Sequence, residues 1–148
     1  MSNHAQVSAG SQNWAILLPE VLAHIVGQLN AVLPEQLTLM VAGPQVVLST
    51  TTGRPRVIAT ETLTIPAEID RAGLATSAAV MLADVQDLVV THLRRPWPTT
   101  TADRSTYPAA ELVGTSLVLR FSTRDDADAI VLQVYSVPEN PPPVVVAG

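Results

Sequence analysis

The sequence predicts an α+β fold, with a five-stranded antiparallel sheet and two helices packed on one face in the order α-β-β-β-α-β-β. Three observations lead to this fold class. Two stretches repeat apolar residues at helical spacing, and five stretches alternate apolar with polar residues. Short breaks rich in glycine or proline separate the neighbouring strands, which favours antiparallel pairing.

Residues 75–95 give the clearest helix. The apolar side chains that recur at steps of three and four are Ala78, Leu82, Val85, Val89 and Leu93. Asp84 and Asp87 fall on the other side, where we expect them to be solvated. Thr76 or Ser77 is expected to cap the start of this helix, and Pro96 ends it.

The first helix is expected from Pro19 to about Val32, because proline is tolerated in a first helical turn. Glu20, His24 and Gln28 follow one another at steps of four, and the prediction places this row on the solvent side. Residues 1–12 are small and polar and are expected to form a flexible amino-terminal segment.

The rest of a single domain, residues 13–137, follows from alternation and breaks. The expected strands are 37–42, 46–51, 56–65, 116–122 and 129–137. Residues 96–113 are predicted to be a long linker, and residues 138–148 a flexible proline-rich tail. No internal sequence repeat is visible. This order of elements is similar to that of class I secretion chaperones, a resemblance that concerns the fold alone.

Composition excludes several classes of function. The 148 residues carry a net charge of −5, and all eight basic residues are arginine, which argues against nucleic acid as a partner. The apolar stretch from Trp14 to Leu33 contains too many polar residues for a membrane span. No basic segment precedes an apolar run, so no signal peptide is expected. We therefore expect a cytoplasmic protein without a nucleic-acid or membrane partner.

Motifs that carry chemistry are absent from the sequence. No Gly-x-Ser-x-Gly, glycine-rich strand-to-helix loop or HExxH occurs. Glu20 with His24 would supply only half of a metal site. Asp125, Asp126 and Asp128 lack the glycine and glutamate that a calcium loop needs. We expect no catalytic residues, no metal and no cofactor.

Two surfaces are candidates for protein contact. Strand alternation sends a set of large side chains to the sheet face away from the helices: Met40, Val47, Ile58, Val118, Val131 and Tyr135. The second surface is a corner of Arg94, Arg95 and Trp97, residue types that are common interface anchors. Trp97 could equally pack against the core at the end of the helix.

These patterns favour a non-enzymatic protein-interaction module, a subunit, adaptor or chaperone-like protein, whose partner is another protein or a second copy of itself. The alternative is a small enzyme or ligand-binding domain with a pocket near Glu61, His92 and residues 96–113. Glu61 shares a face with apolar residues of its strand, so we expect either a bulge at Thr60–Thr62 or an exposed rim to bring it to solvent.

Overall fold

The computed structural model describes residues 13–99, 105–123 and 129–141. The expected flexible segment at 1–12, the aspartates at 125–128 and residues 142–148 of the expected tail lie outside the described residues.

The chain begins with a short 3₁₀ helix that leads directly into the first α-helix. The elements in order are η1 (Trp14–Leu17), α2 (Leu18–Asn30), β1 (Leu37–Ala42), β2 (Gln45–Thr50), β3 (Arg56–Thr62), α3 (Gly73–Leu93), β4 (Tyr107–Val113), β5 (Ser116–Ser122), β6 (Ala129–Val131) and β7 (Tyr135–Ser136). The α+β class, the two helices and the antiparallel pairing are confirmed.

The single five-stranded sheet is wrong, because the strands form two sheets. One contains β1, β2 and β3, and the other contains β4, β5 and β6, with β7 also paired to β5. The segment 96–113, expected to be a linker, contains β4. Val113 pairs with Ser116 across a two-residue turn, so β5 has a partner next to it in the sequence. Pairing with a neighbouring hairpin strand needs little loop closure, and β5 therefore forms a separate sheet instead of extending the first.

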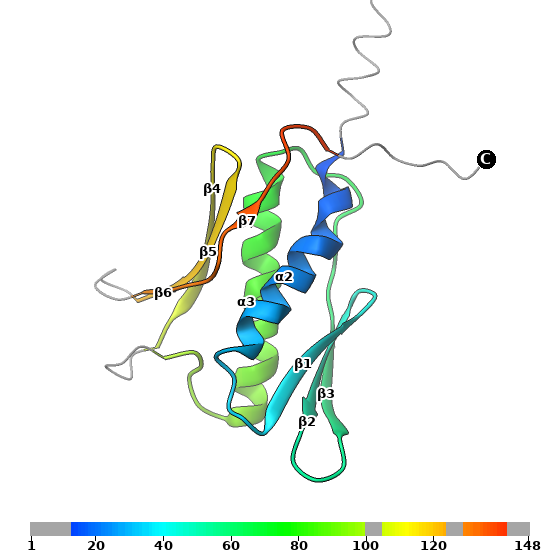
Figure 1. Cartoon of the computed structure of the whole chain (residues 1–148), viewed down its shortest axis with the longest axis vertical. Coiled ribbons are helices and arrows are strands. Elements are labelled where there is room, and N and C mark those ends of the chain that lie inside the picture. Colours follow the sequence, from blue (N-terminus) through cyan, green and yellow to red (C-terminus); the bar gives the residue numbers. More distant parts are fainter. Residues whose placement is uncertain (1–12, 100–104, 124–128, 142–148) are drawn as a thin grey trace, which may run out of the picture.

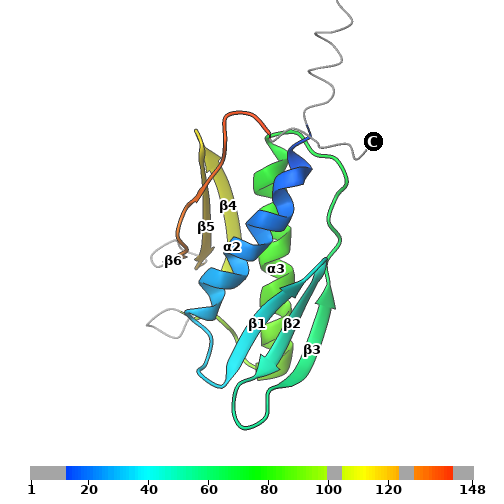
Figure 2. The ribbon, with the colours of Figure 1, turned by 45° about the vertical axis from the view of Figure 1, so that its right-hand side comes forward.

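The fold consists of two halves, each a helix followed by an antiparallel sheet, with three strands in the first half and four in the second. Both halves turn from their first strand to their second through two residues, with Gly43 at φ 60° in one half and Gly114 at φ 61° in the other. This left-handed backbone favours glycine, and it suits the twist of a hairpin. The helices cross between the two sheets (Figures 1 and 2). Thus the order of elements repeats although no sequence repeat is visible.

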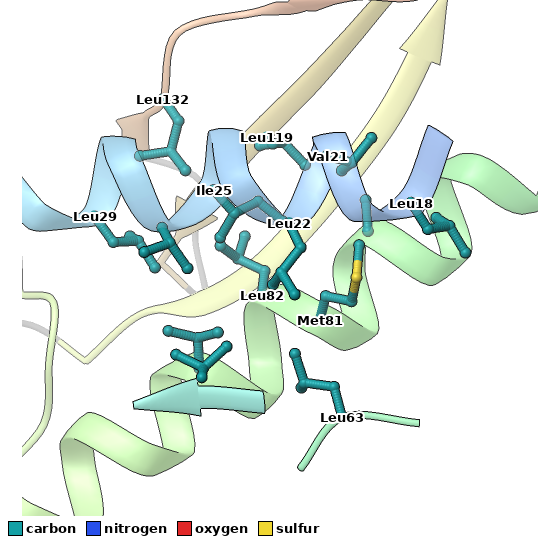
Figure 3. Close-up of a cluster of buried hydrophobic side chains, with 14 of the residues drawn as sticks. Leu18, Val21, Leu22, Ile25, Leu29, Leu63, Met81, Leu82, Leu119 and Leu132 are labelled. Carbon is teal, nitrogen blue, oxygen red and sulfur yellow. The ribbon is translucent and has the colours of Figure 1, made fainter. Parts of the chain in front are cut away.

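Each helix lies against strands of both halves. α2 packs beside β1 of its own half, and hydrogen bonds join it to the segment around Gln133 in the other half. α3 packs beside β4 of its own half and beside β3 of the other. Figure 3 shows side chains of α2, such as Leu22 and Ile25, gathered with Leu82 of α3 and with Leu119 and Leu132 of the second half.

The predicted apolar stripe of α3 forms the centre of this core. Leu82, Val85 and Val89 are fully buried. By length and composition alone α3 could also cross a membrane, a property that core helices of water-soluble proteins share. Contacts with α2 and with strands of both sheets account for its apolar composition here.

The helix caps differ from those expected. α3 begins at Gly73, whose N–H donates to Asp70 Oδ1 (2.8 Å), so neither Thr76 nor Ser77 caps it. Ser77 is buried one turn inside the helix. Arg94, at φ 55°, ends the helix two residues before Pro96.

Candidate functional site

The apolar sheet face predicted for protein contact does not exist as one surface. Met40 lies opposite Val47 in the first sheet, whereas Val118 and Val131 belong to the second. Met40 and Val131 are exposed, at 59% and 61%, and Val47 and Val118 are half-buried. The prediction assumed one sheet, and the division into two separates these side chains.

Ile58 leaves the expected face because of a bulge. Leu48 lies opposite Ala59 and Ser49 opposite Val57, so Ile58 is an extra residue in β3 and packs partly against the core. The bulge lies before the expected position at Thr60–Thr62. Glu61 therefore stays on the helix-facing side, opposite the fully buried Val46, and is half-buried.

Tyr135 is also on the opposite side from the one predicted. Val131 pairs with Arg120 of β5, and Tyr135 pairs with Leu117. The chain from Val131 to Tyr135 contains one residue more than the chain from Leu117 to Arg120 that lies opposite. One extra residue reverses the face of everything after it. Tyr135 consequently faces α2, where its hydroxyl donates to Glu20 Oε2 (2.8 Å), and its neighbour Val134 is 41% exposed.

The corner of Arg94, Arg95 and Trp97 is divided between surface and core. Both arginines are exposed. Trp97 is only 7% exposed, its Nε1–H donates to the carbonyl oxygen of Val32 (3.2 Å), and its ring lies 6.3 Å from that of Phe121. Trp97 therefore packs against the core at the end of the helix, and its ring is not part of an exposed contact surface.

The polar row of α2, expected to face solvent, instead contacts the second half. His24 Nε2 donates to the carbonyl oxygen of Gln133 (2.6 Å), and the N–H of Gln133 donates to Gln28 Oε1 (3.1 Å). At the end of α2, the side chain of Asn30 likewise bonds to the backbone of β1. Its Nδ2 donates to the carbonyl oxygen of Leu39 (3.0 Å), and its Oδ1 accepts from the Leu39 N–H (2.8 Å). Side chains of α2 thus satisfy backbone groups at two sheet edges.

Side chains of α3 do not satisfy the edge of β3 in this way. The Leu63 N–H donates to the carbonyl oxygen of Pro44 (2.8 Å), next to the start of β2. In an antiparallel pair, every second residue points its N–H and C=O at the partner strand. Glu61 and Ala59 therefore also point their backbone groups at β2. The N–H and C=O groups of Thr60 and Thr62 then point away from β2. Among the described residues, no group bonds to them.

The edge of β4, which also lies beside α3, is less open to another strand. By the same alternation, Pro108, Ala110 and Leu112 point their backbone groups away from β5. Pro108 has no N–H, and proline at such a position is a common device against edge pairing. β3 contains no proline.

A hollow of about 520 Å³ lies between β3 and α3. Four consecutive residues of β3 form one wall and two turns of α3 form the other: Ile58, Ala59, Thr60, Glu61, Asp87, Leu88, Thr91 and His92. Consecutive residues alternate between the two faces of a strand, so this wall includes the edge of β3 itself. We call this hollow, together with the free backbone groups of Thr60 and Thr62, the β3–α3 groove.

The β3–α3 groove coincides in part with the pocket considered as an alternative from the sequence. Glu61 and His92 line it as expected, but none of the described residues of 96–113, which are 96–99 and 105–113, does. The sequence analysis did not predict a free strand edge. The one feature of the sequence that is compatible with such an edge is the absence of proline and of charged residues from Ile58 to Thr60.

The electrostatic character of the groove is acidic. Glu61 and Asp87 line it, and within the described part of the chain neither forms an ion pair or a side-chain hydrogen bond. One turn earlier on α3, burial and then the charge of Asp87 raise the pKa of Asp84 above its ordinary value. In the described ranges, no three His, Cys, Asp or Glu side chains lie so that they could hold a metal ion.

Comparisons with protein-family models, curated proteins and solved structures find no match. The similarity to class I secretion chaperones therefore remains one of element order alone.

Proposed function

We propose that this chain is a non-enzymatic protein-interaction module that binds an extended segment of a partner protein as an additional strand on β3, within the β3–α3 groove. The observation that carries the proposal is that no described residue bonds to the edge-facing backbone groups of Thr60 and Thr62, which lie beside that groove. Strand addition to an exposed sheet edge is a common mode of peptide recognition.

The contrast between the helices supports this site. α2 provides Asn30 to one strand edge and His24 with Gln28 to another, whereas α3 provides no such side chain to the described edge of β3. An open strand edge is usually protected against pairing. β1, the other edge of the same sheet, has that protection at Leu39.

Backbone pairing alone gives modest affinity. Thr60 and Thr62 offer four backbone groups, and each new hydrogen bond contributes about 0.5–1.5 kcal/mol net, part of which offsets the ordering of the peptide. Side chains of the partner that enter the hollow must supply the rest. The apolar part of its wall, Ala59 and Leu88, gives them a surface to pack on.

A small-molecule binding domain is the second candidate, because the volume of the hollow falls in the range of ligand pockets. The two candidate functions differ in what the bound molecule does to the edge of β3. A small ligand would leave the amides of Thr60 and Thr62 open to solvent, whereas an added strand protects them.

The test uses extended nonapeptides of alternating threonine and valine, with arginine, leucine or glutamate at the centre. Binding is measured by fluorescence anisotropy, and hydrogen exchange of each backbone amide is measured by NMR. We expect the Thr60 and Thr62 amides to become protected, while those of Ala110 and Leu112 on β4 do not change. If none of the peptides protects Thr60 or Thr62, the proposal is wrong.

A pair of proline variants gives the matched control. Thr60→Pro removes an edge N–H of β3 without removing a bond to β2, and Ala110→Pro does the same on β4. We expect the first to weaken peptide binding at least about tenfold and the second to leave it unchanged. Equal binding to both variants would contradict strand addition at β3, and the exchange experiment on the unmodified protein does not depend on either variant folding.

A further inference from the structure

The geometry of the β3–α3 groove also determines which partner side chains enter the hollow, an inference that rests on the proposed function. A residue paired with Thr60 by two hydrogen bonds places its side chain on the same sheet face as that of Thr60. Thr60 lies opposite Val47, on the face away from the helices. The neighbours of the paired residue therefore face α3, one beside Ala59 and the other beside Glu61.

The two positions beside α3 differ in chemistry. Beside Ala59 the strand contributes apolar Ile58, and beside Glu61 it contributes a carboxylate. From α3 the lining residues are Asp87, Leu88, Thr91 and His92, so the hollow contains two carboxylates, those of Glu61 and Asp87. Among the described residues, no arginine lines the hollow, and the sequence contains no lysine.

We propose that the bound segment carries an arginine or lysine beside Glu61, with its charged group between the carboxylates of Glu61 and Asp87. The methylene groups of such a side chain cover apolar surface while the charge remains near solvent, which matches a hollow with an apolar wall and acidic groups. A partner with an acidic residue at this position is repelled by both carboxylates.

The charges around the groove reinforce this selectivity. Asp84 lies one turn from Asp87, and burial, followed by the charge of Asp87, raises its pKa. The nearest arginines along α3, Arg94 and Arg95, follow its last turn and line no part of the hollow. The net charge of −5 also attracts a basic segment at long range.

The nonapeptides with arginine, leucine or glutamate at the centre test this inference at neutral pH and low salt. We expect the arginine peptide to bind about tenfold more tightly than the leucine peptide, and the glutamate peptide to bind weakest. The advantage of arginine should shrink as salt is added, because the carboxylates are partly exposed.

Charge-removing variants locate the effect. Glu61→Gln and Asp87→Asn should each reduce the preference for arginine over leucine by about threefold or more, with little change for the leucine peptide. Glu111→Gln, which removes a carboxylate of β4, is the matched control and should change neither the arginine preference nor the binding of the leucine peptide.

The outcomes separate the two proposals. If the leucine peptide protects the Thr60 amide and binds as tightly as the arginine peptide, strand addition stands and the basic-residue inference is wrong. The basic-residue inference is also wrong if Glu61→Gln and Asp87→Asn leave the preference for arginine unchanged. If no peptide protects Thr60, both proposals are overturned together.

Discussion

Asn30→Ala tests whether α2 protects the edge of β1. The asparagine side chain makes two hydrogen bonds to the backbone of Leu39, at 2.8 Å and 3.0 Å, and both would be lost. At about 0.5–1.5 kcal/mol for each bond, the loss is about 1–3 kcal/mol. Alanine is the better helix former by at most about 0.7 kcal/mol, and less at the last residue of a helix. The expected net destabilisation is therefore about 0.3–3 kcal/mol.

Urea unfolding followed by circular dichroism measures this difference, and an unchanged slope with denaturant would show that the unfolding reaction is the same. Asn30→Asp is the internal control, because its carboxylate still accepts from the Leu39 N–H but no longer donates to the Leu39 carbonyl oxygen. Its stability should lie between those of the unmodified protein and Asn30→Ala at neutral pH. An alanine variant within about 0.3 kcal/mol of the unmodified protein would refute the edge pairing.

Three further predictions follow from the core, from α2 and from its contact with Tyr135. Val85→Asp should abolish folding, because an unpaired carboxylate at a fully buried position costs several kcal/mol; Val80→Asp, on the 50% exposed side of α3, should keep native circular dichroism. Gly27→Ala should raise stability by about 0.5–1 kcal/mol in the same unfolding assay, since an added Cβ meets nothing within 4 Å; a loss would mean that α2 packs differently. Burial, and then the hydrogen bond and charge of Glu20, raise the pKa of Tyr135 to about 12, so its contribution to stability is complete below the unfolded value near 10 and is lost as pH rises through 12. Absorbance titration of Tyr107→Phe, which leaves Tyr135 as the single tyrosine, should show a midpoint well above 10; a midpoint at the ordinary value would contradict the Tyr135–Glu20 contact.

Local periodicity accounts for what sequence analysis predicted correctly. The step of three and four in α3 and the alternation of Leu117, Leu119 and Phe121 in β5 each depend on residues close together in the chain. The break at Gly43 likewise reflects a backbone conformation that glycine adopts without strain. These features were visible because the side chains that decide them lie within one element.

The candidate site was only partly accessible from the sequence. Glu61 and His92 were associated with one pocket, and both line the β3–α3 groove. The extra residue Ile58 could not be located, because a bulge is defined against the partner strand and not by the strand's own pattern.

The sequence by itself determined the class of fold and the long central helix, because hydrophobic periodicity is a local property. Only the tertiary structure decided that the strands form two sheets, that Tyr135 faces α2 and that β3 keeps an open edge. These outcomes depend on contacts between distant residues, such as Gln28 and Gln133, which are 105 positions apart. Whether a backbone group is satisfied is decided by what packs beside it, and for Thr60 that neighbour is a helix whose side chains do not bond to it.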